Sequence, residues 1–178
     1  MRAVEVGFNV VGLDNNEYRT SALEKGISFI DDVSGQRLQA ALASNRYLPT
    51  TAYANAAGFD VAVITVPTPL RESLPDLTFI ESAARDIAPH IRVGSTVVLE
   101  STTYPGTTEE LLIPILEKGS GLAAGRDFSV GYSPERIDPG NKTWNFQNTP
   151  KVVSGLDASS LRDVSSFLPA VSRYGGAS

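Results

Sequence analysis

The chain has 178 residues, of which 42% are hydrophobic and 20% are charged, and its formal net charge is -5. This length and composition are typical of one globular domain with a buried core. An acidic chain without a run of Lys or Arg lacks the electrostatic footprint of nucleic-acid or anionic-membrane binding, so we predict neither partner.

Cysteine is absent and His90 is the single histidine. The chain therefore cannot form disulfides, thiolate zinc sites or histidine metal clusters by itself, and we predict no metal. No apolar stretch approaches the ~20 residues of a membrane span, and the first residues lack the basic-then-apolar plan of a signal peptide. We therefore predict a cytoplasmic protein.

Short β-branched runs alternate with helical patterns along the chain, which is the signature of βαβ units and a mostly parallel sheet. The fold class is therefore α/β. Strands are predicted at residues 8–13, 60–66, 95–100 and 128–133, with 150–155 as a weaker fifth. Helices are predicted at about 16–25, 34–44, 76–88, 107–118 and 158–168.

Two helix starts carry capping signals. Asp76 precedes an amphipathic stretch, and Thr107 with Glu110 has the spacing of a capping box after a Pro-Gly turn. The small, polar end of the chain, residues 169–178, is expected to fray.

The first predicted strand ends on an acidic residue, Asp14. A carboxylate at the end of the second strand of a dinucleotide fold accepts hydrogen bonds from the adenosine ribose, which favours NAD over its 2'-phosphorylated relative. Arg19, five residues on, could lie over the adenine or pair with a phosphate. A simple turn cap is the alternative for Asp14.

The second strong strand ends in Thr65, Val66, Pro67 and Thr68. Parallel strands deliver ligand contacts at their carboxyl ends, and two prolines in this exit make the backbone rigid and hold Thr68 in place. The alternative is an ordinary proline-bearing strand exit.

Ser101, Thr102 and Thr103 follow the next strand, just before a predicted helix start. Three hydroxyls beside free helix amides can bind an anion or orient a water molecule. No partner base is evident nearby, so we do not predict a nucleophilic threonine.

Glu135 and Arg136 follow the fourth strand, between prolines. The carboxylate could act as a general acid or base, and the guanidinium could clamp a phosphate or sugar carboxylate. The alternative is a solvated Glu-Arg pair. His90 lies on the side opposite these strand ends and is predicted to be a surface residue.

In this order and spacing, the chain resembles the amino-terminal domain of the UDP-glucose/GDP-mannose dehydrogenase family over about residues 3–168. The motifs are "VVGLDNNEYR", "VPTPLRESLPDLTFIESA", "VVLESTTYPGTTEE" and "YSPERIDPGN…PKVVSG". The last two are similar to the branch that acts on UDP-N-acetylhexosamines.

The resemblance implies a Rossmann-like, doubly wound fold and a four-electron oxidation, in which the sugar C6 alcohol becomes a carboxylate while two NAD+ are reduced. A cysteine carries the covalent intermediates in that family. By the resemblance, the adenosine end of NAD is bound by Asp14 and Arg19, and the rest of the cofactor by Thr65 to Thr68 and Ser101 to Thr103. Thr102 also positions the hydrolytic water, Glu135 acts as acid or base and contacts substrate, and Arg136 lies near the substrate.

The chain also departs from the family pattern. Pro139 occupies the position of a second acidic residue of the UDP-glucose branch, which argues against UDP-glucose as the simple substrate, and the family's lysine, asparagine and cysteine have no counterpart here. The first strand and the glycine-rich turn are also lacking, because Met1 falls inside the first helix and neither Gly7 nor Gly12 replaces that turn.

We therefore expect residues 1–168 to be an incomplete NAD-binding domain that is inactive alone. By the resemblance, the parent protein is a homo-oligomer formed through other segments. Two alternatives stay open, a nucleotide-binding module without catalysis and another Rossmann-like enzyme such as a methyltransferase.

Overall fold

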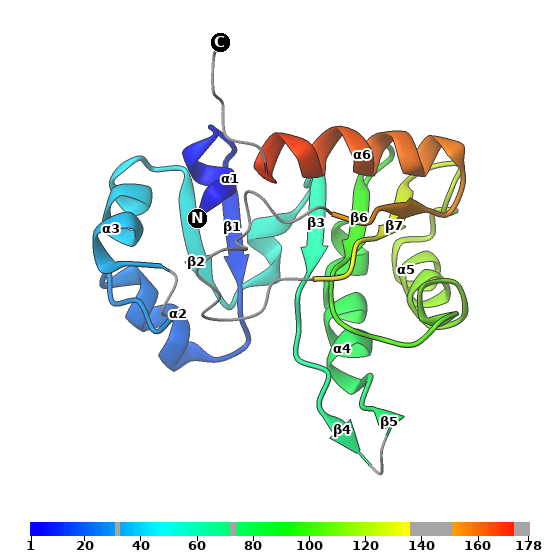
Figure 1. Ribbon diagram of the computed structural model, residues 1–178, viewed down its shortest axis with the longest axis horizontal. Helices are drawn as coiled ribbons and strands as arrows, with labels where there is room; N and C mark the ends of the chain where they lie inside the picture. Colours follow the sequence, from blue (N-terminus) through cyan, green and yellow to red (C-terminus); the bar gives the residue numbers. More distant parts are fainter. Residues whose placement is uncertain (31–32, 72–73, 136–150, 173–178) are drawn as a thin grey trace. The chain divides into compact units, whose positions relative to one another are not determined.

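The structure is a computed structural model, and it describes residues 1–30, 33–71, 74–135 and 151–172 (Figure 1). Contacts divide it into two compact units, residues 1–56 with the end of the last helix, and residues 57–169. Each unit is built around its own parallel strands.

The first unit is a βαβ arrangement in which β1 and β2 pair in parallel. The side chain of Asn16 accepts hydrogen bonds from the backbone at the start of α2, and Ser34 does the same for α3. The elements are α1 (Arg2–Glu5), β1 (Val10–Leu13), α2 (Glu17–Glu24), α3 (Gly35–Ala43), β2 (Tyr47–Thr50) and η1 (Tyr53–Ala56).

Strand β2 is absent from the sequence prediction because it reads YLPT, with a proline inside a short run. Within its two-stranded sheet β2 needs only one partner, so Pro49 is tolerated without its N–H. Gly12 of β1 lies opposite Pro49, and a Cβ there would come 2.7 Å from the Tyr47 hydroxyl. The glycine therefore gives the Tyr47 ring room to lie across β1.

The second unit holds a four-stranded sheet in the order β3-β6-β7-β8, in which only β8 is antiparallel (Figure 1). Its strands are β3 (Val61–Ile64), β6 (Thr96–Leu99), β7 (Ser129–Tyr132) and β8 (Ser154–Gly155), and β4 (Leu70–Arg71) pairs separately with β5 (Leu74–Pro75). Its helices are α4 (Thr78–Ile87), η2 (Ala88–His90), η3 (Thr107–Leu112), α5 (Ile113–Ser120) and α6 (Ala158–Ser172).

The core of the second unit forms around β6, whose four residues are all buried. Helix α6 crosses the sheet (Figure 1), and its Val164 and Leu168 pack against Val98 of β6. Helix α4 buries Ile80, Ala84 and Ile87, a spacing of four and three residues that puts them on one face. The mostly parallel α/β fold predicted from the sequence is confirmed.

Every predicted helix and strong strand is present, with boundaries that differ by a few residues. Asp76 accepts a hydrogen bond from the Thr78 backbone N–H at the start of α4, as the sequence indicated. The capping box predicted for Thr107 and Glu110 is wrong. Gly106, at φ 93°, precedes a π-helical turn that has no side-chain cap, and Thr107 instead donates its hydroxyl proton to the Tyr104 carbonyl.

Gly155 of β8 has no space for a side chain. A Cβ there would lie 2.6 Å from Leu161 Cα in the backbone of α6. Because this backbone cannot yield without moving the helix, we expect Gly155→Ala to lower the free energy of unfolding by about 1–3 kcal/mol, measured by urea denaturation. In the control Gly35→Ala, the nearest atom would be Gly26 O at 3.7 Å. Equal urea midpoints for the two variants would contradict the expectation.

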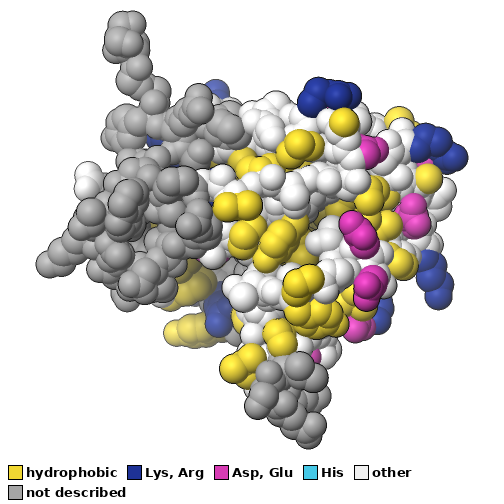
Figure 2. Space-filling model, turned by 45° about the vertical axis from the view of Figure 1, so that its right-hand side comes forward, with side chains coloured by type: hydrophobic (Ala, Val, Ile, Leu, Met, Phe, Trp, Pro, Cys, Tyr) yellow, Lys and Arg dark blue, Asp and Glu magenta, His cyan; other side chains and the backbone are white. Residues whose placement is uncertain are grey.

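Hydrophobic side chains gather in a band on the face shown in Figure 2, with charged side chains at its margin. Several large hydrophobic residues of the second unit are exposed to solvent. Val152 is 52% exposed and Tyr104 is 47% exposed. Among the described residues, no helix is long and apolar enough to cross a membrane.

Candidate functional site

Asp14 lies directly after β1, where the sequence placed it. One carboxylate oxygen accepts a hydrogen bond from the Asn16 N–H at 2.9 Å, and the other lies 3.4 Å from Arg19 Nη1. The Asp14 side chain remains 31% exposed. Asp14 therefore caps the turn while its side chain stays partly exposed.

The Asp14 carboxylate interacts with two nearby side chains, those of Arg19 and Tyr47. The Arg19 guanidinium lies 5.7 Å from the centre of the Phe29 ring while it pairs with Asp14. Burial, with a smaller contribution from the Asp14 charge, raises the pKa of the Tyr47 hydroxyl. At the end of β1, the Asp14 carboxylate is thus paired with the Arg19 guanidinium, which the Phe29 ring also contacts.

The carboxyl ends of β3 and β6 are joined by Ser101. Its buried hydroxyl lies 2.8 Å from the Val66 carbonyl and 3.4 Å from the Ile64 carbonyl. This bond holds the exit of β3 against the exit of β6. The loop that follows β3 leaves Thr65 and Pro67 exposed and Thr68 half-buried.

Thr102 and Thr103 differ in their surroundings although they are neighbours. Thr103 donates a 2.6 Å hydrogen bond to the Thr107 hydroxyl, which continues to the Tyr104 carbonyl. Thr102 is exposed, and no hydrogen bond of its hydroxyl is seen within the described part of the chain. Of Ser101, Thr102 and Thr103, only Thr102 is exposed.

Glu135 follows β7, and among the described residues it forms an ionic cluster with Lys151 and Glu100 that the sequence did not predict. The Lys151 ammonium lies 2.9 Å from Glu100 Oε1 and 3.2 Å from Glu135 Oε2. Burial raises the pKa of the Glu100 carboxyl, and the Lys151 charge opposes that rise. No local pattern indicated this cluster, because Lys151 and Glu100 are 51 residues apart.

Ser133 adds a buried hydroxyl at the same strand end. The residue is fully buried, and its Oγ has no hydrogen-bond partner among the described residues. Its backbone N–H donates to the Leu99 carbonyl, which fixes it beside β6. A buried hydroxyl of this kind calls for an explanation, and an additional polar partner would supply one.

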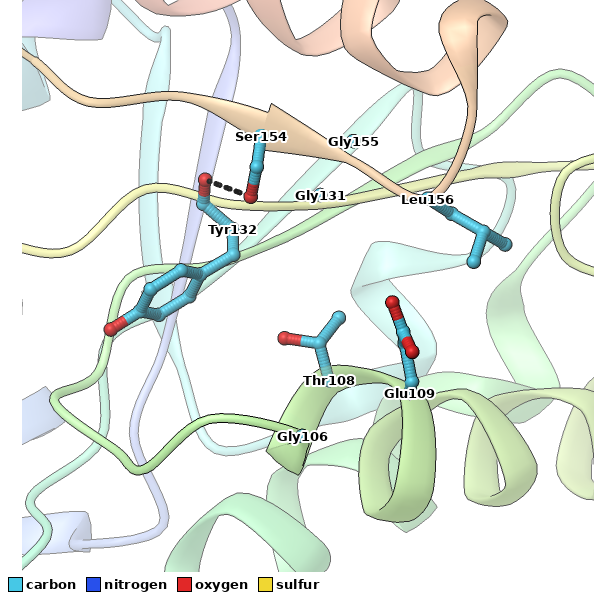
Figure 3. Close-up of a pocket in the computed structure, with 8 residues that line it drawn as sticks. All are labelled: Gly106, Thr108, Glu109, Gly131, Tyr132, Ser154, Gly155 and Leu156. Atoms are coloured by element: carbon cyan, nitrogen blue, oxygen red, sulfur yellow. Dashed lines mark hydrogen bonds between the residues drawn. The ribbon is translucent and has the colours of Figure 1, made fainter.

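A small cavity of about 190 Å³ lies between the start of η3 and the strands β7 and β8. Thr108 and Glu109 point toward it from η3, and Tyr132 borders it from β7 (Figure 3). It holds none of the predicted site residues, and its volume is below the ~300 Å³ typical of ligand pockets. We assign it no ligand.

Two further predictions from the sequence concern Arg136, as a residue near the substrate, and the absence of a metal site. Arg136 lies outside the described residues. Within the ranges that are described, no group of three or more His, Asp or Glu residues could hold a metal ion.

Parallel strands with helical crossovers, and polar residues at the strand ends, define a Rossmann-like nucleotide-binding domain. Residues 1–168 match the UDP-glucose/GDP-mannose dehydrogenase family, NAD binding domain, and the chain belongs to this family. Membership in an NAD-binding domain family confirms the predicted cofactor.

Among curated relatives, UDP-N-acetyl-D-glucosamine 6-dehydrogenase from Pseudomonas aeruginosa is 41% identical over 86% of this chain. The enzyme of the same name from Salmonella typhi is 41% identical over 88% of the chain. Protein CapL from Staphylococcus aureus is 39% identical over 91%. The chain spans 36–38% of the length of these three relatives.

Solved structures agree with the fold. The UDP-D-ManNAc dehydrogenase from Pyrococcus horikoshii matches 98% of this chain and 41% of its own, with a TM-score of 0.88 and 28% identity. A ternary complex of GDP-mannose dehydrogenase from Pseudomonas aeruginosa matches 94% of this chain and 39% of its own, with a TM-score of 0.82 and 31% identity.

Proposed function

We propose that this chain is the NAD-binding part of an NAD-dependent dehydrogenase that oxidises the C6 alcohol of a UDP-N-acetylhexosamine to the uronic acid. One observation carries the sugar class. The two relatives named UDP-N-acetyl-D-glucosamine 6-dehydrogenase are 41% identical to the chain. Relatives named for N-acetylmannosamine or N-acetylgalactosaminuronic acid are only 30–34% identical.

The described residues fit the parts of NAD that the proposal assigns to them. Asp14 has a partly exposed carboxylate at the end of β1, which suits the adenosine ribose hydroxyls. In the second unit, Thr65, Thr68 and Thr102 carry hydroxyls in the loops that follow strands β3 and β6. When bound, NAD+ supplies the hydride acceptor.

For the chemistry, we propose Thr102 and Glu135 as the residues that act on the reacting groups. They follow β6 and β7, which are neighbours in the sheet. The Glu135 carboxylate can take up or donate a proton, and the Thr102 hydroxyl can orient a water molecule or a substrate oxygen. Ser101 and Thr103 support this loop, because both hydroxyls are hydrogen-bonded within the protein.

The sequence contains no cysteine. If the reaction passes through a thioester, as the family resemblance implies, the thiol comes from outside these 178 residues. We therefore expect the chain to bind NAD+ but to show no steady turnover by itself.

Calorimetric titration with NAD+, UDP-N-acetylglucosamine and S-adenosylmethionine tests the binding proposal, and NADH absorbance tests turnover. Heat from NAD+ but not from S-adenosylmethionine is the expected result. Binding of S-adenosylmethionine with no response to NAD+ would overturn the proposal, and steady NADH formation by the chain would refute its inactivity.

We also propose that the protein acts in the cytoplasm as a homo-oligomer with a UDP-sugar as its substrate. The names of the relatives support the substrate class. Size-exclusion chromatography with light scattering tests the oligomeric state on a protein of the relatives' full length, and a monomer at micromolar concentration would contradict it.

A further inference from the structure

We propose that Lys151 is a positioning residue for Glu135, and that Glu100 is the buried counter-ion that holds Lys151 in place. The inference rests on the proposed function, in which Glu135 is the acid or base. It adds two residues, Lys151 and Glu100, to which neither the sequence patterns nor the family resemblance gave a role.

The sheet register brings Lys151 to Glu135. In the antiparallel pair, Gly131 faces Gly155 and Tyr132 faces Ser154. Each step forward on β7 is a step backward on β8, so the same register continued by three residues places residue 151 opposite residue 135. Lys151 and Glu135 lie just outside the paired residues, and the extended register agrees with the 3.2 Å contact between their side chains.

The second neighbour strand brings Glu100 to the same place. In the parallel pair of β6 and β7, Leu99 faces Tyr132. Glu100 is the next residue after β6, and its carbonyl accepts a hydrogen bond from the Glu135 N–H at 3.3 Å. Three consecutive strands of the sheet thus deliver the three charged side chains to one end.

Burial is graded across the cluster. The side chains of Lys151 and Glu100 are 9% and 10% exposed, whereas that of Glu135 is 40% exposed. The inner pair neutralises itself, and the ammonium also touches the outer carboxylate. The cluster therefore has a buried ion pair, Lys151 with Glu100, and a more exposed carboxylate, Glu135, that the same ammonium contacts.

A purely structural ion pair is a poor explanation for this arrangement. Burying two charges costs desolvation that their attraction often fails to offset, so an apolar pair would hold the fold equally well. Positioning does require the charge, because an acid or base misplaced by about 1 Å can lose on the order of 100-fold in rate. We infer that the buried Lys151–Glu100 pair holds the Glu135 carboxylate in position.

Lysine ammonium NMR tests the contact without any need for activity. The sequence has four lysines, so the Lys151 Nζ signal can be assigned from its loss in Lys151→Met. We expect Glu135→Gln to shift this signal and to speed exchange of its protons with water. The matched control Glu109→Gln, at an exposed position on η3, should leave it unchanged. An unmoved signal in Glu135→Gln would mean that Lys151 serves Glu100 alone and would overturn the inference.

Steady-state kinetics test whether the Lys151–Glu100 pair affects catalysis. The assay uses the full-length protein that turns over UDP-N-acetylglucosamine. The double variant Lys151→Met with Glu100→Gln removes both buried charges together, so no lone charge is left to unfold the domain. We expect kcat to fall roughly 10- to 100-fold, with the KM for NAD+ within about threefold. Unchanged kcat in a folded double variant would overturn the inference. Absence of turnover in the unsubstituted protein would refute the proposed function, while the ammonium signal still decides the role of Lys151.

Discussion

Asp14→Ala is expected to weaken NAD+ binding roughly 10- to 150-fold, since a hydrogen bond to a charged acceptor contributes about 1.5–3 kcal/mol. The ratio of NAD+ to NADP+ affinity should also fall, because the carboxylate that repels a 2'-phosphate is gone. NMR or calorimetric titration of the two nucleotides measures both effects.

The control for Asp14→Ala must separate ligand contact from turn stability, because Asp14 also accepts the Asn16 N–H. Asp86→Ala removes an exposed carboxylate of α4 whose contact is a 3.5 Å hydrogen bond from Ser82 Oγ, and it should leave both affinities unchanged. Asp14→Asn keeps an acceptor for the turn while it removes the charge. Equal NAD+ affinity in Asp14→Ala and Asp86→Ala would show that Asp14 is only a turn residue.

The positions of the strand ends could be predicted from the sequence because β-branched runs stop visibly at polar or proline-rich stretches. Asp14, the loop from Thr65 to Thr68, the residues after β6 and Glu135 all lie where the pattern placed them. A short apolar run bounded by turn residues is the local signal of a buried parallel strand.

The missing parts of the prediction are those set by contacts distant in sequence. Strand β2 carries Pro49, which a local pattern counts against a strand, and only its pairing with β1 makes it one. Lys151 lies 16 and 51 residues from its two partners, so no motif joins them. Ser101 is a third case, because its hydroxyl donates a hydrogen bond to the carbonyl of Val66, which is distant in sequence.

Lys151→Met is expected to lower the free energy of unfolding by about 3–5 kcal/mol near neutral pH, because it leaves the Glu100 carboxylate buried without its cation. Urea denaturation measures the loss. The exposed Lys118→Met on α5 is the matched control and should change stability by at most about 0.5 kcal/mol.

The pH dependence of Lys151→Met distinguishes a stranded charge from simple loss of packing. Burial raises the pKa of folded Glu100 above its ordinary value of 4.5, and removing Lys151 removes a group that lowers it. A carboxyl with a raised folded-state pKa binds more protons in the folded state, so stability falls as the pH rises above 4.5 and recovers on acidification. The deficit of Lys151→Met should therefore shrink as the pH falls toward 4.5. Adding Glu100→Gln should abolish most of the deficit at neutral pH, whereas a deficit that is constant with pH and survives in the double variant would mean that the Lys151 chain stabilises the fold by packing alone.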